Sequence, residues 1–364
     1  MPKYAGLAKP HQPNWQGLVD NILRKGTPDR AYHMELFHDG EIASAIIDRF
    51  DLDPGINRDH PDWGRRRYIA LLRFLGFDCV NVGLIIAGPQ LFWDRTTDTA
   101  ERPHEGGRGY LNEHAGPITN WEQFEKFQWP DPNAPGVAAE LEWYQKNLPD
   151  DMGIIGMAGG HYAEWLTWLM GYETLCLSLY DQRDLVRAIA DKLREIFRDA
   201  ARQVLQFDRV KMIWGSDDMG FKTQPLISPK DAREFFLPGH KEIAAMSHAV
   251  GRPYLLHACG NLNDIIDDLI DDVKIDAKHS FEDTIEDVRQ VKHTYGRRIA
   301  MIGGIDVDFL CRADEKAIRK RIRETLEICM PGGGYCLGSG NSVANYIPLD
   351  NYLAMVDEGR LYAV

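Results

Sequence analysis

Eight short apolar segments recur along the chain, and most of them are followed by an amphipathic pattern of helical period. They cover residues 32–37, 79–86, 153–158, 210–215, 253–258, 273–277, 299–303 and 334–338. Apolar runs of this length bounded by polar or glycine-rich sequence are typical of buried strands. Buried strands that alternate with helices predict a (β/α)8 TIM barrel, although run length alone also fits a doubly wound open sheet.

Helical patterns lie between most of these segments, over residues 65–75, 173–204, 229–250, 261–271, 284–295 and 314–330. The last opens with Asp314, a residue type that caps helix N-termini, and stops at a proline followed by three glycines. We expect residues 1–30 to form a polar N-terminal arm with one short helix, and residues 31–364 to form the barrel. Residues 88–149 show weak periodicity and predict an insertion over the barrel mouth that would cover a substrate.

Composition and charge narrow the class of protein. The 364 residues carry a formal net charge of −13, which is unfavourable for binding nucleic acid or an anionic membrane surface. No uninterrupted apolar stretch reaches membrane-spanning length and the N-terminus lacks a signal-peptide core, so we expect a cytoplasmic protein. Six cysteines are too few for a disulfide scaffold, which leaves them as buried filler, metal ligands or nucleophiles.

His257 and Cys259 are the sharpest chemical signal. They directly follow an apolar run, and residues i and i+2 of a strand point to the same side, so both side chains can aim at one point. Imidazole and thiolate are zinc donors, and the glycine after Cys259 allows a sharp turn. Cys336, at the end of the last apolar segment, is the candidate third ligand, because strand C-termini gather at one barrel mouth. The alternative interpretation makes His257 a core histidine and both cysteines buried filler.

Two adjacent carboxylates, Asp217 and Asp218, follow the fourth apolar segment. At a barrel mouth they can orient a metal ligand, act as acid or base, or fill the fourth metal position, whereas the plainer alternative is a helix cap and a solvated side chain. His161 follows two glycines and is a candidate substrate contact.

Weaker candidates for substrate binding are Glu35 and His38 after the first segment, His279 after the sixth, and Asn341 in the glycine-rich segment. No phosphate-loop, dinucleotide-binding or serine-hydrolase motif is present, so those chemistries are unsupported.

The sequence resembles the uroporphyrinogen decarboxylase superfamily. The resemblance is carried by GGHYAEWLTWLMGYE at 159–173, DDMG at 217–220 with ISP at 227–229, HACG at 257–260, GGID at 303–306 and YCLGSG at 335–340. It implies a (β/α)8 barrel with its site at the C-terminal mouth. The arginine-rich N-terminal motif of the true decarboxylases is absent, and His-x-Cys with a distant Cys resembles the cobamide-dependent methyltransferases, whose zinc ligands would be His257, Cys259 and Cys336 here.

This branch implies a zinc-dependent methyltransferase that moves a methyl group between a corrinoid and a small thiol or an O- or N-methylated substrate. The chain lacks an Asp-x-His-x-x-Gly corrinoid-binding segment, so the cobalamin would arrive on a partner corrinoid protein. Two alternatives remain: a decarboxylase acting on a porphyrinogen, and a non-catalytic barrel that binds a small molecule. A homodimer is an open alternative to a monomer.

Overall fold

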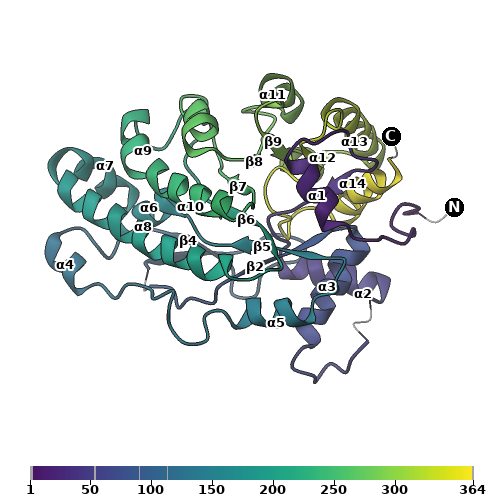
Figure 1. Cartoon of the computed structure of the whole chain (residues 1–364), viewed down its shortest axis with the longest axis horizontal. Helices are drawn as coiled ribbons and strands as arrows, with labels where there is room; N and C mark the ends of the chain where they lie inside the picture. Colours follow the sequence, from purple (N-terminus) through teal and green to yellow (C-terminus); the bar gives the residue numbers. More distant parts are fainter. Residues whose placement is uncertain (1–2, 53–54, 90, 113, 363–364) are drawn as a thin grey trace.

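One curled sheet of eight parallel strands forms the centre of the molecule, in a computed structural model that describes residues 3–52, 55–89, 91–112 and 114–362 (Figure 1). The strand order is β1-β10-β9-β8-β7-β6-β5-β2. The strands are β1 (Tyr32–His33), β2 (Cys79–Gly83), β5 (Gly153–Met157), β6 (Val210–Ser216), β7 (Tyr254–His257), β8 (Ala277–His279), β9 (Ala300–Ile302) and β10 (Tyr335–Leu337). Each of the eight predicted segments overlaps one of them, so the predicted (β/α)8 barrel is confirmed.

The two end strands, β1 and β2, are joined differently from the rest. No backbone ladder links them in the described residues. Instead, Nδ2 of Asn81 on β2 donates hydrogen bonds to the carbonyl oxygens of Glu35 (3.0 Å) and Leu36 (2.9 Å), just after β1. A side-chain amide therefore bridges the seam of the barrel.

Helices pack outside the sheet (Figure 1). They are α1 (Trp15–Ile22), α2 (Gly40–Phe50), α3 (Trp63–Leu75), α4 (Trp121–Lys126), α5 (Ala139–Asn147), α6 (Tyr162–Met170), α7 (Tyr172–Asp181), α8 (Arg183–Leu205), α9 (Pro229–Phe235), α10 (Leu237–Ala249), α11 (Val288–Tyr295), α12 (Val307–Arg312), α13 (Glu315–Cys329) and α14 (Leu349–Leu361). Asp314 caps α13 by accepting from the Ala317 amide at 2.8 Å, as predicted. No helix in the described part of the chain is long and apolar enough to span a membrane.

The region before β8 differs from its prediction. The helix expected over 261–271 is a short π-helix, η1 (Asp268–Val273), and the strand expected over 273–277 begins only at Ala277. Lys274 ends η1 in the left-handed conformation, with φ of +66°. Val273 and Ile275 are apolar because they pack into the helical layer, which the run of apolar residues alone does not reveal.

The N-terminal arm closes one end of the barrel. Leu18 and Ile22 of α1 belong to the same apolar cluster as the barrel-lining side chains Trp214, Leu255 and Cys336. The start of the arm is tied to α14, where Asp357 accepts hydrogen bonds from the amides of residues 6 and 7. The interior is therefore a packed core, and a ligand has to bind at the opposite end.

The insertion contains a two-stranded antiparallel hairpin, β3 (Trp93–Thr96) and β4 (Arg108–Leu111), that crosses the mouth. Asn345 accepts from Arg108 and donates to the Arg102 carbonyl at 2.7 Å. Nδ1 of His104 in the same segment is 2.7 Å from Oε1 of Glu41 on α2. We call residues 93–111 the strap, since Asn345 and Glu41 hold them against the barrel.

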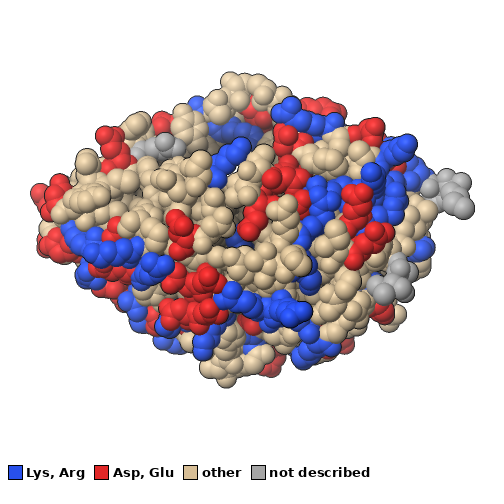
Figure 2. Space-filling model, turned by 90° about the horizontal axis from the view of Figure 1, so that it is seen from above, with Lys and Arg blue, Asp and Glu red and all other residues tan. Residues whose placement is uncertain are grey.

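Charged side chains of both signs intermingle over the face shown in Figure 2. Many are paired locally, as where Arg298 contacts Asp267 and Asp271, each at 2.7 Å. Exposed pairs of this kind contribute little stability, about 0–1 kcal/mol each.

Candidate metal centre

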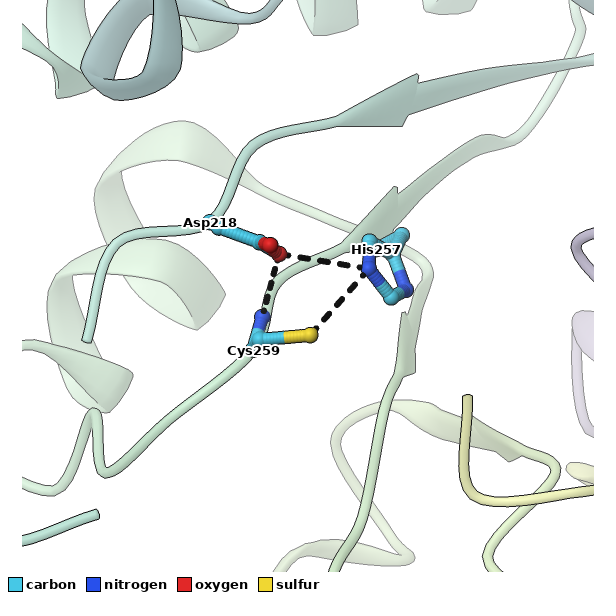
Figure 3. A group of neighbouring side chains, drawn as sticks. All are labelled: Asp218, His257 and Cys259. Carbon is cyan, nitrogen blue, oxygen red and sulfur yellow. Dashed lines mark hydrogen bonds and ion pairs between the residues drawn. The ribbon is translucent and has the colours of Figure 1, made fainter. Parts of the chain in front are cut away.

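Asp218, His257 and Cys259 converge just beyond the C-terminal ends of β6 and β7 (Figure 3). The register pairs Ser216 with His257, and Asp218 and Cys259 each come two residues later on their own segments. Nε2 of His257 lies 3.3 Å from Oδ1 of Asp218 and 3.3 Å from Sγ of Cys259. Parallel neighbouring segments thus deliver a carboxylate, an imidazole and a thiol to one point.

A glycine makes this convergence possible. Gly260 has φ of +86°, and a Cβ there would lie 2.1 Å from the carbonyl oxygen of Gly220. The two segments are held together by the Asn261 amide, which donates to the Phe221 carbonyl at 2.7 Å. Any side chain at residue 260 would push the segment of Cys259 away from that of Asp218.

Neighbouring groups orient the imidazole and the thiol. Nδ1 of His257 is 2.7 Å from Nδ1 of His279 on the adjacent strand β8. Burial, together with nearby positive groups, holds the pKa of His279 well below its usual value. A neutral His279 accepts from Nδ1–H of His257, and this assignment leaves Nε2 of His257 free to bind a metal. Asn341 donates from Nδ2 to Sγ of Cys259 at 3.1 Å.

Asp218 and Cys259 differ in their charge states. Partial burial acts to raise the pKa of Asp218, but the neighbouring His257 side chain and the backbone amide of Cys259 lower it to about 2, so Asp218 is ionised at neutral pH. Burial and the adjacent Asp218 raise the pKa of Cys259 above its usual value. A cation at this point is the ordinary means of converting such a thiol to thiolate.

The donor set fits zinc. Zinc binds imidazole nitrogen and carboxylate oxygen at roughly 2.0–2.2 Å and thiolate at about 2.3 Å, so tetrahedral donors lie about 3.3–3.7 Å apart. The 3.3 Å separations from His257 Nε2 meet that requirement. One carboxylate and one thiolate balance the charge of Zn²⁺, and three protein ligands leave one position open, as in catalytic sites.

The structure does not bring Cys336 to this group. Cys336 is buried in the barrel interior and accepts a hydrogen bond from Nδ2 of Asn21 on α1 at 3.4 Å. It pairs with Tyr32, the first residue of β1, which places it near the end closed by the arm. Among the described residues, Asp218 takes the third position that the sequence hypothesis gave to Cys336.

Asp217 turns away from its neighbour into the core. Its fully buried carboxylate accepts from the amides of Ala163 and Glu164 at the start of α6, and from Nε2 of His240 at 2.9 Å. Nδ1 of His240 lies 2.9 Å from the hydroxyl of Tyr254. The helix that follows the pair, α9, is capped by Ser228 rather than by either aspartate. Asp217 accepts from the amides of the earlier helix α6, and Asp218 lies in the candidate metal group.

Glu35 and His38 lie among other partners. Both oxygens of the buried Glu35 carboxylate contact Ser339, from its amide at 2.9 Å and its hydroxyl at 2.6 Å. Nε2 of His38 is 2.7 Å from the hydroxyl of Tyr352 on α14, and burial lowers the pKa of His38 to about 4. Neither residue lines the cavity described next.

A cavity of about 560 Å³ opens beside Asp218 and is bounded by α6, α7 and the strap. Its acidic lining is Asp218 and Glu164. Oε2 of Glu164 is 2.5 Å from Nδ1 of His161, which contacts this lining residue but is not itself part of the lining. Burial acts to lower the pKa of His161, but Glu164 and the nearby aspartates raise it overall.

A second cavity, of about 400 Å³, lies against the strap and is lined by Glu41, Arg95 and His104. Trp93 and Gly109 line both cavities. Asp39, Glu41 and His104 also form a second group of potential metal ligands, and Nδ1 of His104 is 2.7 Å from Oε1 of Glu41.

Sequence reasoning missed Glu164 and His240. Glu164 lies on the cavity-facing first turn of α6, four residues after a glycine pair, and that position after a strand was its available signal. His240 sits within an amphipathic helix, where nothing local distinguishes it from a surface histidine.

The fold and the site together define a (β/α)8 barrel with a His–Cys–Asp group at its C-terminal mouth. The family profile described as Uroporphyrinogen decarboxylase (URO-D) matches residues 107–362, and this chain belongs to that family. No protein of curated function matches the sequence significantly.

Solved structures share the fold at low identity. A methyltransferase from Methanosarcina mazei is similar with a TM-score of 0.65 and 18% identity, over 94% of this chain and 97% of that one. A putative vitamin-B12 independent methionine synthase from Listeria monocytogenes is similar with a TM-score of 0.50 and 12% identity, over 92% and 96% of the two chains.

Proposed function

We propose that this protein is a zinc-dependent methyltransferase that moves a methyl group between a corrinoid and a small thiol or an O- or N-methylated substrate. The observation that supports this most is the Asp218–His257–Cys259 group, which has the donor spacing of a three-ligand zinc site and opens onto a cavity. One structural neighbour of the same fold is named a methyltransferase, which is in keeping with methyl transfer, whereas the other is named a putative vitamin-B12 independent methionine synthase.

Each part of the site has a task in this function. Asp218, His257 and Cys259 hold the metal, while His279 and Asn341 orient two of its ligands. When bound, the zinc would activate by coordination a substrate thiol or an oxygen that bears a methyl group. A quaternary nitrogen has no lone pair and would give up its methyl group without coordinating the metal. The His161–Glu164 pair can hold or release a proton at the cavity wall. The corrinoid would be presented at the mouth by a partner protein.

The lining of the cavity argues against the decarboxylase alternative. Its charged side chains, among the described residues, are the carboxylates Glu164 and Asp218, with no lysine or arginine. A porphyrinogen that carries several carboxylates would meet like charge there, which is unfavourable by several kcal/mol at close range. We therefore expect no turnover of uroporphyrinogen.

Metal analysis tests the ligand set. We expect about one zinc per chain in the native protein and loss of most of it in Cys259→Ser and Asp218→Asn, because two remaining ligands bind zinc weakly. Cys336→Ser is the matched control, since it removes a thiol that lies outside the group, and it should keep its zinc. Full occupancy in Cys259→Ser would contradict the assignment.

Activity is tested separately. The zinc-loaded protein should consume methylcobalamin in the presence of an acceptor thiol, or demethylate a methylated donor onto reduced corrinoid, and Cys259→Ser should not. Decarboxylation of uroporphyrinogen by metal-free protein at the same rate as by the zinc-loaded protein would overturn the proposal.

A further inference from the structure

The walls of the 560 Å³ cavity are unusually aromatic for a site with two carboxylates. Five rings line it, from the strap, from α6 and α7, and from the segment after β6: Trp93, Tyr110, Trp168, Tyr172 and Phe221. The volume is that of a small-molecule site, which is ordinarily 300–1,000 Å³.

Both hydroxyl groups of the wall beside Glu164 are already hydrogen-bonded to the backbone. The hydroxyl of Tyr172 donates to the Leu226 carbonyl at 2.6 Å. The hydroxyl of Thr167 donates to the carbonyl of Glu164 at 2.7 Å. Tyr172 and Phe221 meet edge to face, with centroids 5.5 Å apart at 85°, so this part of the wall offers a ligand mainly aromatic surface.

The charge of the cavity is negative on the side of α6. Glu164 does not belong to the metal group, so its carboxylate faces the cavity even when Asp218 binds a metal. Among the described residues, Oε1 of Glu164 has no hydrogen-bond partner, while Oε2 is held by His161. Of the strap arginines, Arg95 lines the second cavity instead, and Arg108 donates to Asn345.

We propose that the small-molecule substrate of this site is a methylated ammonium compound, held by the aromatic walls through cation–π contacts and by the carboxylate of Glu164. Aromatic rings with a nearby acid are the combination that recognises quaternary ammonium groups, which cannot donate a hydrogen bond. The inference rests on the proposed function, because it specifies the N-methylated member of the substrate classes given there.

The transfer implied is balanced. The carbon–nitrogen bond breaks with both electrons remaining on nitrogen, so a tertiary amine leaves. The new bond to the methyl carbon takes its electron pair from the nucleophilic acceptor, a reduced corrinoid presented by the partner. No further oxidant or reductant is consumed.

Calorimetric titration of the purified full chain tests the ligand class without any corrinoid. The probes are choline and 3,3-dimethylbutan-1-ol, which has the same shape with carbon in place of the charged nitrogen. We expect choline to bind about 5- to 30-fold more tightly, which corresponds to one to two kcal/mol of cation–π attraction. Equal or tighter binding of the neutral alcohol, or no binding of choline, would overturn the inference.

Variants locate the binding. Trp93→Leu, at a ring that is 58% exposed and so dispensable for folding, and Glu164→Gln should each weaken choline binding about 5- to 30-fold. Trp121→Leu, at an exposed ring of α4 outside the cavity, is the matched control and should bind like the native protein. Circular dichroism confirms folding, and native-like binding by both cavity variants would refute the site.

Failure of this inference is distinguishable from failure of the proposed function. If choline binds but the protein holds no zinc and transfers no methyl group, the proposed ligand class is supported and the proposed function is refuted. If the protein transfers methyl groups from neutral ethers but does not bind choline, the proposed function is supported and the proposed ligand class is refuted.

Discussion

The buried carboxyl group of Glu35 is protonated in the folded protein, and this has a measurable consequence. The hydroxyl of Ser339 lies 2.6 Å from Oε2 of Glu35 and 2.9 Å from the carbonyl oxygen of Asn341. Ser339 donates to both oxygens of the Glu35 side chain, from its amide to Oε1 and from its hydroxyl to Oε2. Burial raises the pKa of Glu35 to about 8, in spite of its two hydrogen bonds with Ser339.

The direction of the pH effect follows from this pKa. In the unfolded chain Glu35 titrates near 4.5, so between about pH 5 and pH 8 the folded state holds a proton that the unfolded state has released. The stability contributed by this group is fully present below pH 4.5 and is lost as the pH rises through 8. At 1.36 kcal/mol per pH unit, the change from pH 6 to pH 9 amounts to about 3 kcal/mol.

Glu35→Gln should remove this pH dependence. The glutamine amide can donate to the Ser339 hydroxyl and its oxygen can accept from the Ser339 amide, so the hydrogen bonds of the protonated acid are retained. We expect the variant to be more stable than the native protein by about 2 kcal/mol at pH 6 and by about 5 kcal/mol at pH 9, so that the difference grows by about 3 kcal/mol between the two pH values.

Urea denaturation at both pH values measures the difference, and all other titrating groups cancel between the two proteins. Glu122→Gln, at an exposed carboxylate of α4, controls for the loss of one negative charge. A stability difference between native protein and Glu35→Gln that is the same at pH 6 and pH 9 would show that Glu35 is ionised throughout.

Two further substitutions test the packing around the site. Asp217→Asn weakens a buried, charged acceptor of three hydrogen bonds and should lower the free energy of unfolding by about 2–4 kcal/mol in urea titrations; a loss below about 1 kcal/mol would contradict its structural role. Gly260→Ala should destabilise the protein and reduce its zinc content, because the new Cβ meets the Gly220 backbone. Gly251→Ala is the control, since it has φ of +72° but open space around it, and should cost only about 1–2 kcal/mol and keep zinc.

The sequence predicts the eight barrel strands well because they are buried on both sides, unlike the exposed hairpin strands β3 and β4. A parallel barrel leaves continuous apolar runs, and only the segment before β8 misleads, since apolar residues such as Ile275 serve the helical layer there. The helix α14 escapes prediction for the related reason that it is buried nearly all round, so it shows no amphipathic period.

The candidate site could be predicted only as far as local geometry determines it. The alternation of a strand correctly joins His257 with Cys259, because they are two residues apart. The alternation does not show how far along the barrel axis a residue lies. Cys336 lies within its strand, whereas Asp218 and Cys259 lie beyond the C-terminal ends of theirs. The choice between Asp217 and Asp218 depended on His240 and α6, which are distant in sequence.

The strap has a consequence for how the two cavities act on each other. Trp93 and Gly109 form part of the wall of both, and the strap is held against the barrel by Asn345 and Glu41. A ligand in one cavity that fixes the position of the Trp93 side chain therefore also changes the wall of the other cavity. Thermodynamic linkage makes such an effect reciprocal. If a ligand in the cavity lined by Glu41 and His104 changes the affinity of the cavity beside Asp218 for its own ligand, that second ligand changes the affinity of the first by the same factor.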